Sequence, residues 1–194
     1  MKPSFAATVR ADLESQVHDN YRRSWTYWPR VVAKALVTPA IHVVLVFRIS
    51  SLLYQNVLTR PLAFVLRGLT IVWGGTEIHP SARIGPGLCL MHSQSVVIGP
   101  GVVIGANARI AHGVGIGADA GRGAAEGTSG YPTVGDDVMF AAFSAVLGPV
   151  TIGDHAVVGA QSLVMRDVPS YALVMGSPAR KVRMLDEPLE GAAP

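Results

Sequence analysis

The segment SVVIGPGVVIGANARIAHGVGIG, residues 95–117, places an aliphatic residue at every sixth position. The same six-residue period extends in both directions over residues 78–169 without a polar member. This period differs from the ~3.6 residues of a helical turn and is typical of a parallel β-helix, in which each hexapeptide forms a short strand and a corner. The members of the series are Ile78, Ile84, Leu90, Ile98, Ile104, Ile110, Ile116, Val134, Phe140, Val146, Ile152, Val158 and Val164.

A β-sandwich of many short strands is the alternative fold for this stretch. Strands of sandwiches usually recur at roughly 8 to 12 residues, which is longer than the spacing found here. Glycine follows many of the aliphatic positions and suits corners, because it reaches backbone angles that are costly for other residues. We therefore predict a mainly β protein whose β-helix covers residues 77–169, with three hexapeptides in each coil.

Two breaks interrupt the repeat. Two extra residues separate Leu90 from Ile98, and a longer break covers residues 118–133 with the sequence ADAGRGAAEGTSGYPT. Small and polar residues of this kind cannot supply a core, so the longer segment is expected to loop out. A long insertion in an otherwise regular solenoid is usually functional or disordered, and we interpret this one as functional.

Residues 1–76 are predicted to form an amino-terminal helical segment. A helix is expected over residues 11–23, followed by apolar helices over residues 31–55 and 61–75. Pro39 should kink or interrupt the first apolar helix, and Pro61 should start the second.

The apolar residues 31–74 allow two roles. A spanning helix needs ~18 or more apolar residues with few charges, and basic residues interrupt these runs. The helices can pack on one another or on the open end of the β-helix, where they would cover unpaired strand edges. Alternatively, they can lie peripherally on the inner face of a membrane. The interrupting residues are Lys34, Arg48, Arg60 and Arg67.

Composition narrows the functional classes. The formal net charge of +3 is small and the basic residues are scattered, which argues against nucleic acid as a partner. Cys89 is the single cysteine, so no intramolecular disulfide can form. The first residues lack the apolar core of a signal peptide, and we expect a cytoplasmic location.

The register of the repeat brings two histidines together. His92 and His112 each follow the third aliphatic residue of a coil by two positions, and Ala142 and Ala160 hold the same place in the next two coils. Residues one coil apart should stack at steps of about 4.8 Å, so these four form a column along one edge. An elongated ligand could lie there with its reactive end at the histidines.

Histidine is the natural general base, because its pKa lies near neutrality. A carboxylate usually orients such a base, and the nearest candidate is Glu77, at the entry to the first coil. Alternatively, Glu77 is a solvated charge at the start of the β-helix. Cys89 shows no sign of an activated nucleophile. A metal site would need three converging histidines, and only two stack here, so we predict no metal.

The motifs EIHPSARIG, LMHSQSVVIGPGVVIGANARIAHGVGIG, GYPTVGDDV, VVGAQSLVMRDVP and GSPARKV resemble those of the serine acetyltransferase branch of hexapeptide acyltransferases. This resemblance implies a left-handed β-helix, a homotrimer, and acetyl-CoA bound in a groove between neighbouring subunits. It implies that His92 removes the acceptor proton, with Glu77 in place of an aspartate partner. It also implies a tail, residues 170–194, that closes over the nucleotide end. The implied CoA contacts are Ala118, Ala142, Ala160, and Arg180 or Lys181 for phosphate.

Departures from the family pattern concern the acceptor. Met91 stands where the family has an aspartate, and Gly130 and Tyr131 replace an Arg-His pair. The large helical domain that supplies another serine-binding aspartate is replaced by the short apolar segment. Free serine needs partners for both of its charges, because an unpaired buried charge costs several kcal/mol or more. We therefore expect Met91, His112 and Tyr131 to contact a different acceptor.

A saccharide, free or linked to lipid, is the acceptor that we predict. The stretch VFRISSLLYQ, residues 46–55, is similar to the amino-terminal part of exopolysaccharide acetyltransferases related to colanic-acid biosynthesis. Tyr131 would suit a sugar by stacking or hydrogen bonding. Three alternatives stay open: serine O-acetyltransferase, a non-catalytic trimeric scaffold, and a metal-dependent enzyme of the carbonic anhydrase type.

Overall fold

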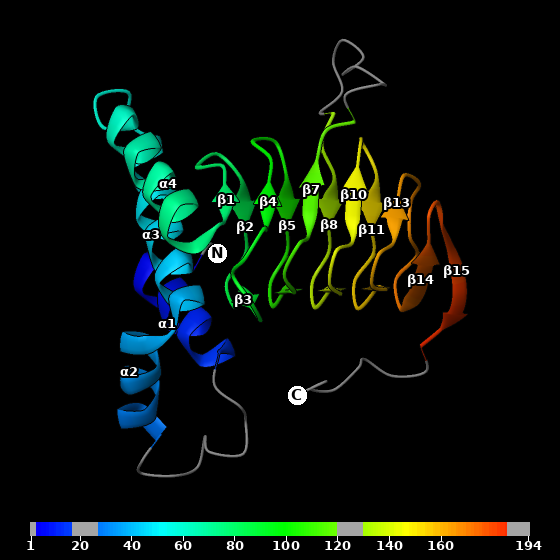
Figure 1. The fold of residues 1–194 in the computed structure, drawn as a ribbon, viewed down its shortest axis with the longest axis horizontal. Helices are drawn as coiled ribbons and strands as arrows, with labels where there is room; N and C mark the ends of the chain where they lie inside the picture. The colour runs from blue at the N-terminus through cyan, green and yellow to red at the C-terminus, as the bar shows by residue number, and fades with distance from the viewer. Residues whose placement is uncertain (1–2, 17–26, 120–129, 186–194) are drawn as a thin grey trace.

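A computed structural model describes residues 3–16, 27–119 and 130–185. Within these residues, a group of helices precedes a long stack of short parallel strands, and a β-hairpin follows it (Figure 1). The strands belong to three sheets, and the predicted left-handed parallel β-helix is confirmed.

Each of the first four coils contributes one strand to each sheet, and the last coil contributes strands to the first and third sheets. The first sheet contains β1 (Glu77–Ile78), β4 (Val97–Ile98), β7 (Gly115–Gly117), β10 (Ala145–Leu147) and β13 (Leu163–Val164). The second contains β2 (Arg83–Ile84), β5 (Val103–Ile104), β8 (Thr133–Val134) and β11 (Thr151–Ile152). The third contains β3 (Cys89–Leu90), β6 (Arg109–Ile110), β9 (Met139–Phe140), β12 (Val157–Val158), β14 (Ala172–Gly176) and β15 (Ala179–Met184).

The aliphatic series fills the interior of the β-helix. In every strand from β1 to β13, the series residue is buried. The residue before it is half-buried or exposed, except in β12, where Val157 is buried as well. Fully burying one Ile, Val or Leu side chain contributes about 1.5–3 kcal/mol, so the stacked series is the main stabilising element of the fold. Its most deeply buried members include Leu90, Ile110, Phe140, Val146, Ile152 and Val158, each with 0% of its surface exposed.

The third sheet continues past residue 169, the predicted end of the repeat. Val174 of β14 pairs with Val158 of β12, and β15 then returns antiparallel to β14. The six-residue count misses β14, because Val174 lies ten residues after Val164 and Val168 makes only an isolated bridge with Ile152. The hairpin of β14 and β15 therefore forms the far end of the stack.

The first helix lies earlier than expected. Helix α1 (Phe5–Ser15) begins six residues before the predicted start at residue 11, because the Ser4 hydroxyl caps it by accepting a hydrogen bond from the Ala7 amide at 3.2 Å. The rest of the predicted segment, residues 17–23, lies outside the described residues.

Both proline predictions for the apolar helices are confirmed. Helix α2 (Tyr27–Val37) and helix α3 (Pro39–Tyr54) are separate helices that meet at Pro39. Helix α4 (Arg60–Gly74) has Pro61 in its first turn and is capped by Gly75, whose φ of 61° is left-handed. No single helix in the described ranges is long and apolar enough to cross a membrane, although Trp28–Val37 and Pro39–Tyr54, bent by 88°, meet that test as a pair.

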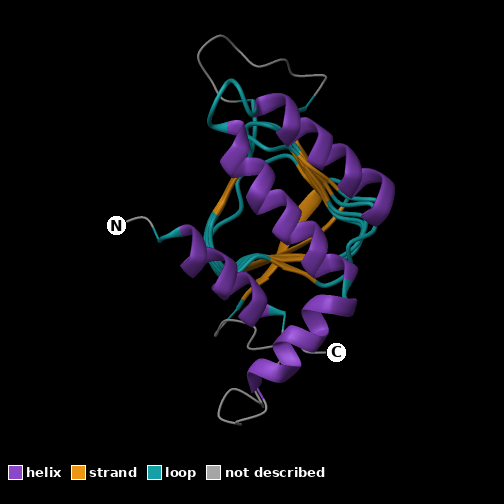
Figure 2. Cartoon of the chain, turned by 90° about the vertical axis from the view of Figure 1, so that its left-hand side faces the viewer, coloured by secondary structure: helices purple, strands orange, loops and turns teal. Residues whose placement is uncertain are grey.

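Helices α1, α3 and α4 pack against the open end of the first coil, which is one of the two predicted roles (Figure 2). Ala40, Val43, Val44 and Phe47 of α3 join the same buried cluster as the aliphatic series. Helix α4 lies against α3 so closely that a methyl group on Gly74 would come within 2.6 Å of the Val43 side chain.

A buried ion pair attaches the helices to the first coil. Arg48 of α3 donates to both carboxylate oxygens of Asp12 in α1, at 2.8 and 3.0 Å. The same guanidinium donates to the Ile84 and Gly85 carbonyls, each at 2.6 Å, and Asp12 accepts from the Leu88 amide at 2.9 Å. Arg48 thus satisfies edge carbonyls that have no preceding coil to pair with.

Candidate active site

The predicted column is present in the structure. Strands β3, β6, β9 and β12 pair in register, with Leu90 opposite Ile110, Ile110 opposite Phe140 and Phe140 opposite Val158. The residues two positions further on therefore stack along the corner that leads from the third sheet to the first, which we call the histidine corner. They are His92, His112, Ala142 and Ala160.

The column is one step longer than the repeat indicated. Because Val158 pairs with Val174, Gly176 occupies the corresponding place in the last coil. The Gly176 amide donates to the Ser162 hydroxyl at 3.1 Å, which holds the hairpin turn at the end of the column. The column therefore has imidazoles at one end and small residues over the rest of its length.

The two histidine rings are close neighbours. Their centroids are 5.5 Å apart and their planes meet at 70°, in an edge-to-face arrangement. The Phe143 ring lies on the other side of His112, at 4.9 Å and 87°. His92 is exposed and His112 is half-buried, so a ligand can reach His92 from solvent.

Glu77 lies beside the histidine corner but is paired elsewhere. The Glu77 amide donates to the Val96 carbonyl at 2.8 Å, and Thr76 donates its hydroxyl to the Ser93 carbonyl, so both residues adjoin the corner that carries His92. The Glu77 carboxylate forms an ion pair with Arg67 of α4. No hydrogen bond joins Glu77 to His92 among the described residues, and such bonds often tighten only when substrate is bound.

The predicted acceptor residues are divided between two corners. Met91 precedes His92, and its amide donates to the Ile110 carbonyl at 2.9 Å. Tyr131 instead packs on the corner that leads from the first sheet to the second, which we call the tyrosine corner. A methyl group on Gly99 of this corner would lie 3.1 Å from the Tyr131 ring. Within one chain, Met91 and His112 therefore lie beside His92, whereas Tyr131 lies on the other side of the first sheet.

The predicted CoA residues show the same division. Ala142 and Ala160 lie in the column, whereas Ala118 is exposed directly after β7, on the tyrosine corner. A groove that used all three would need the histidine corner of one chain and the tyrosine corner of another.

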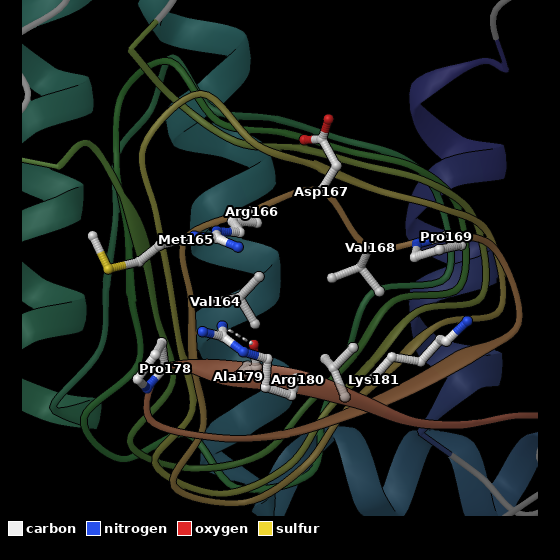
Figure 3. A pocket seen from close by; sticks show the side chains of 11 residues that line it. Val164, Met165, Arg166, Asp167, Val168, Pro169, Pro178, Ala179, Arg180 and Lys181 are labelled. Carbon is white, nitrogen blue, oxygen red and sulfur yellow. Dashed lines mark hydrogen bonds between the residues drawn. The ribbon is translucent and has the colours of Figure 1, made fainter.

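Arg180 and Lys181 line a pocket at the end of the last coil (Figure 3). The pocket has a volume of about 390 Å³, and Val164, Val168 and Val174 form part of its wall. Arg166 is a third basic side chain of this pocket that sequence reasoning missed, although it lies within the quoted motif VVGAQSLVMRDVP. The pocket lies at the far end of the molecule from His92, next to the hairpin turn where the column ends.

Two ionisable groups near the first coil have shifted pKa values. Burial raises the pKa of the Cys89 thiol, against smaller opposing effects of Arg109 and Lys34, so the thiol is not an activated nucleophile. Burial and the charge of Arg67 lower the pKa of His79, which stacks edge-on with Tyr54 and Phe64. In the described ranges, no three His, Cys, Asp or Glu side chains are placed to hold a metal ion.

Known proteins with similar sequences indicate the family of this chain. Residues 131–166 match the bacterial transferase hexapeptide (six repeats) family. The serine acetyltransferase of Helicobacter pylori strain 26695 is 36% identical over 150 residues, which cover 76% of this chain and 83% of that protein. Serine acetyltransferase 2 of Arabidopsis thaliana is 43% identical over 113 residues, which cover 58% of this chain.

Solved structures extend the similarity to nearly the whole chain. The serine acetyltransferase of Neisseria gonorrhoeae matches with a TM-score of 0.81 and 33% identity, over 94% of this chain and 66% of that one. A serine acetyltransferase of Brucella abortus strain S19, solved in complex with coenzyme A, matches with a TM-score of 0.80 and 28% identity, over 93% of this chain and 68% of that one.

The relatives also bear on the predicted acceptor and on the predicted membrane contact. The chain spans about a third (34%) of the Arabidopsis relative's length. The relatives do not support the resemblance to exopolysaccharide acetyltransferases, the saccharide acceptor or membrane contact through residues 31–74. With 36% identity to a protein of which it covers 83%, this chain belongs to the serine acetyltransferase family of hexapeptide-repeat transferases.

Proposed function

We propose that this protein is an acetyl-CoA-dependent O-acetyltransferase and that L-serine is its acceptor. The observation that carries the proposal is the position of His92, an exposed imidazole at one end of a column of small residues, in a chain related to serine acetyltransferases. This replaces the saccharide as first choice, because the relatives favour the serine alternative.

The column and the end pocket fit the shape and charge of the donor. Ala142, Ala160 and Gly176 have little or no side chain, so an extended pantetheine arm can lie against the backbone along this edge. Arg166, Arg180 and Lys181 supply positive charge beyond the far end, where the phosphates of CoA would lie. Bound acetyl-CoA supplies an activated acetyl group at the histidine end.

His92 acts as the general base in this proposal. Its imidazole takes the proton from the acceptor hydroxyl as the oxygen attacks the thioester carbonyl carbon. It then returns the proton to the sulfur when the carbon–sulfur bond breaks. Glu77 would orient the imidazole once substrate draws its carboxylate from Arg67 to the ring.

We further propose a homotrimer in which each site lies between two chains. Ala118 and Tyr131 lie on the tyrosine corner and His92 on the histidine corner of the same chain, so a complete site needs two neighbouring copies. A non-catalytic scaffold would not require His92 on one corner and Ala118 and Tyr131 on the other.

A saccharide is the second candidate acceptor. It is favoured by Met91 and Tyr131, which offer no charge to the ammonium or carboxylate of serine. A sugar hydroxyl needs neither charge, and the Tyr131 ring could stack on a sugar face.

The test is release of CoA from acetyl-CoA by the full chain, with L-serine and with a panel of saccharides. We expect turnover with L-serine, identification of O-acetylserine by mass spectrometry, and a loss of ~10²-fold or more in His92→Ala. Turnover with a saccharide but not with serine would reverse the choice of acceptor. Undiminished activity in His92→Ala would overturn the catalytic assignment.

A further inference from the structure

The site described so far has a base but no group for the oxygen of the thioester carbonyl. As the acceptor attacks, negative charge develops on this oxygen, and a positioned hydrogen-bond donor at that point is often the largest single contribution to catalysis. Such a donor must lie close to His92, on the side from which the acetyl group arrives.

His112 occupies that side. It stands one coil beyond His92, in the direction of Ala142, Ala160 and Gly176, along which the pantetheine arm lies in the proposed function. A thioester carbonyl that reaches His92 from this direction must pass His112. With ring centroids 5.5 Å apart, the two imidazoles can contact two oxygens bound to the same carbon atom.

The structure holds the His112 ring in place. Phe143 packs edge-on against it at 4.9 Å, and Phe143 itself adopts a left-handed φ of 58°. The Phe143 ring covers Gly113, where a methyl group would come within 2.4 Å of it, so only glycine at this position permits the contact. His112 is thus fixed between the rings of His92 and Phe143, as a donor should be before the reaction.

The ring nitrogens of His112 are also available. No hydrogen bond to another described residue uses them, whereas His79 binds the Ser81 hydroxyl and His42 binds the Ala35 carbonyl through theirs. A half-buried imidazole without a protein partner, beside the proposed base, is suited to a ligand.

We propose that His112 is a further catalytic residue, which donates a ring N–H to the thioester carbonyl oxygen as the acceptor attacks. This inference rests on the proposed function. The acceptor oxygen forms a bond to the carbonyl carbon, the carbonyl double bond opens onto its oxygen, and His92 holds the acceptor proton. His112 stabilises this oxygen until the double bond re-forms and the carbon–sulfur bond breaks, when His92 gives the proton to sulfur.

This role differs from the acceptor contact predicted from the sequence, and kinetics separates the two. Removing a donor used only in the transition state lowers kcat and leaves KM little changed, whereas removing a contact to the acceptor raises its KM. We therefore expect His112→Leu to lose ~10²–10³-fold in kcat, with similar KM values for acetyl-CoA and acceptor. His112→Gln, which keeps an N–H donor, should recover part of the loss.

The experiment measures steady-state CoA release for wild type, His112→Leu and His112→Gln, using whichever acceptor the wild type accepts. Acetyl-CoA hydrolysis without acceptor is a second readout, because water attack places charge on the same oxygen. His155→Leu is the matched control and should keep wild-type kcat, because His155 lies between β11 and β12 on a different corner and stacks on Tyr171. Thermal melting and gel filtration confirm folding of each variant.

The outcomes are distinct. Normal kcat in His112→Leu, or a rise confined to the KM of the acceptor, overturns the inference and leaves the proposed function intact. Equal loss in the glutamine and leucine variants also overturns it, because the donor would not matter. Absence of any CoA release by the wild type, with every acceptor and with water, removes the proposed function and this inference together.

Discussion

Arg48 and Asp12 form a buried pair whose side chains expose only 8% and 2% of their surface. In the sequence, Arg48 appears as a charge that interrupts an apolar run and weighs against a membrane span. In the structure it donates to a carboxylate and to two backbone carbonyls, so its charge is compensated inside the protein. No local pattern identifies Asp12 as its partner, because the two residues lie 36 positions apart in different helices.

Asp12→Ala should destabilise the protein strongly. It leaves the Arg48 guanidinium buried without its carboxylate, a change that typically costs about 3–5 kcal/mol. Urea unfolding of the purified protein measures this difference. The matched control is Glu14→Ala in the same helix, where the Arg10–Glu14 pair is exposed and should contribute less than about 1 kcal/mol. Equal losses in the two variants would contradict the anchoring role of Asp12.

At the scale of secondary-structure elements, periodicity predicted the strands far better than the helices. The six-residue spacing located the strands from β1 to β13, because each aliphatic residue has one place in its coil. It failed at β14, where the spacing changes and only pairing with β12 defines the strand. Helix α1 was placed too late, because its start depends on a single cap at Ser4 and not on an apolar pattern.

Helix α4 contains two glycines that should respond oppositely to substitution. Gly74→Ala places a methyl group 2.6 Å from the Val43 side chain and should destabilise the contact of α4 with α3, by roughly 1–3 kcal/mol. Gly68→Ala meets no atom within 4 Å and should be neutral or stabilising by up to about 1 kcal/mol, since alanine favours the helix. Thermal and urea unfolding compare the two variants. An unchanged free energy of unfolding in Gly74→Ala would contradict a tight contact between Gly74 and Val43.

At the scale of the whole molecule, the candidate site was only partly predictable. Stacking of His92, His112, Ala142 and Ala160 followed from counting, because a coil repeats its register. The separation of Tyr131 from this column was not predicted, because Tyr131 packs on the corner at which the inserted loop interrupts the β-helix. The end pocket depends on β15, whose return along β14 has no repeat pattern.

Sites shared between chains should allow two inactive variants to restore one another. His92→Ala removes the base on the histidine corner, and Ala118→Trp should block the tyrosine corner, where Ala118 is exposed. In a trimer that contains both variants, one site of the three, or roughly a third, would combine two intact corners. We expect CoA release near that fraction of wild type, measured on mixed trimers purified through two different tags. Mixed trimers without activity would place the whole site within one chain.

The stacked coils also act as a ruler. Four steps of about 4.8 Å separate His92 from Gly176, or roughly 19 Å in all, and this length depends on the number of coils and on no individual side chain. A ligand held at both ends must therefore match a distance that substitutions cannot adjust by small amounts. Only the gain or loss of an entire coil would change it, in increments of one strand spacing. The β-helix therefore selects its ligand by length as well as by chemical groups.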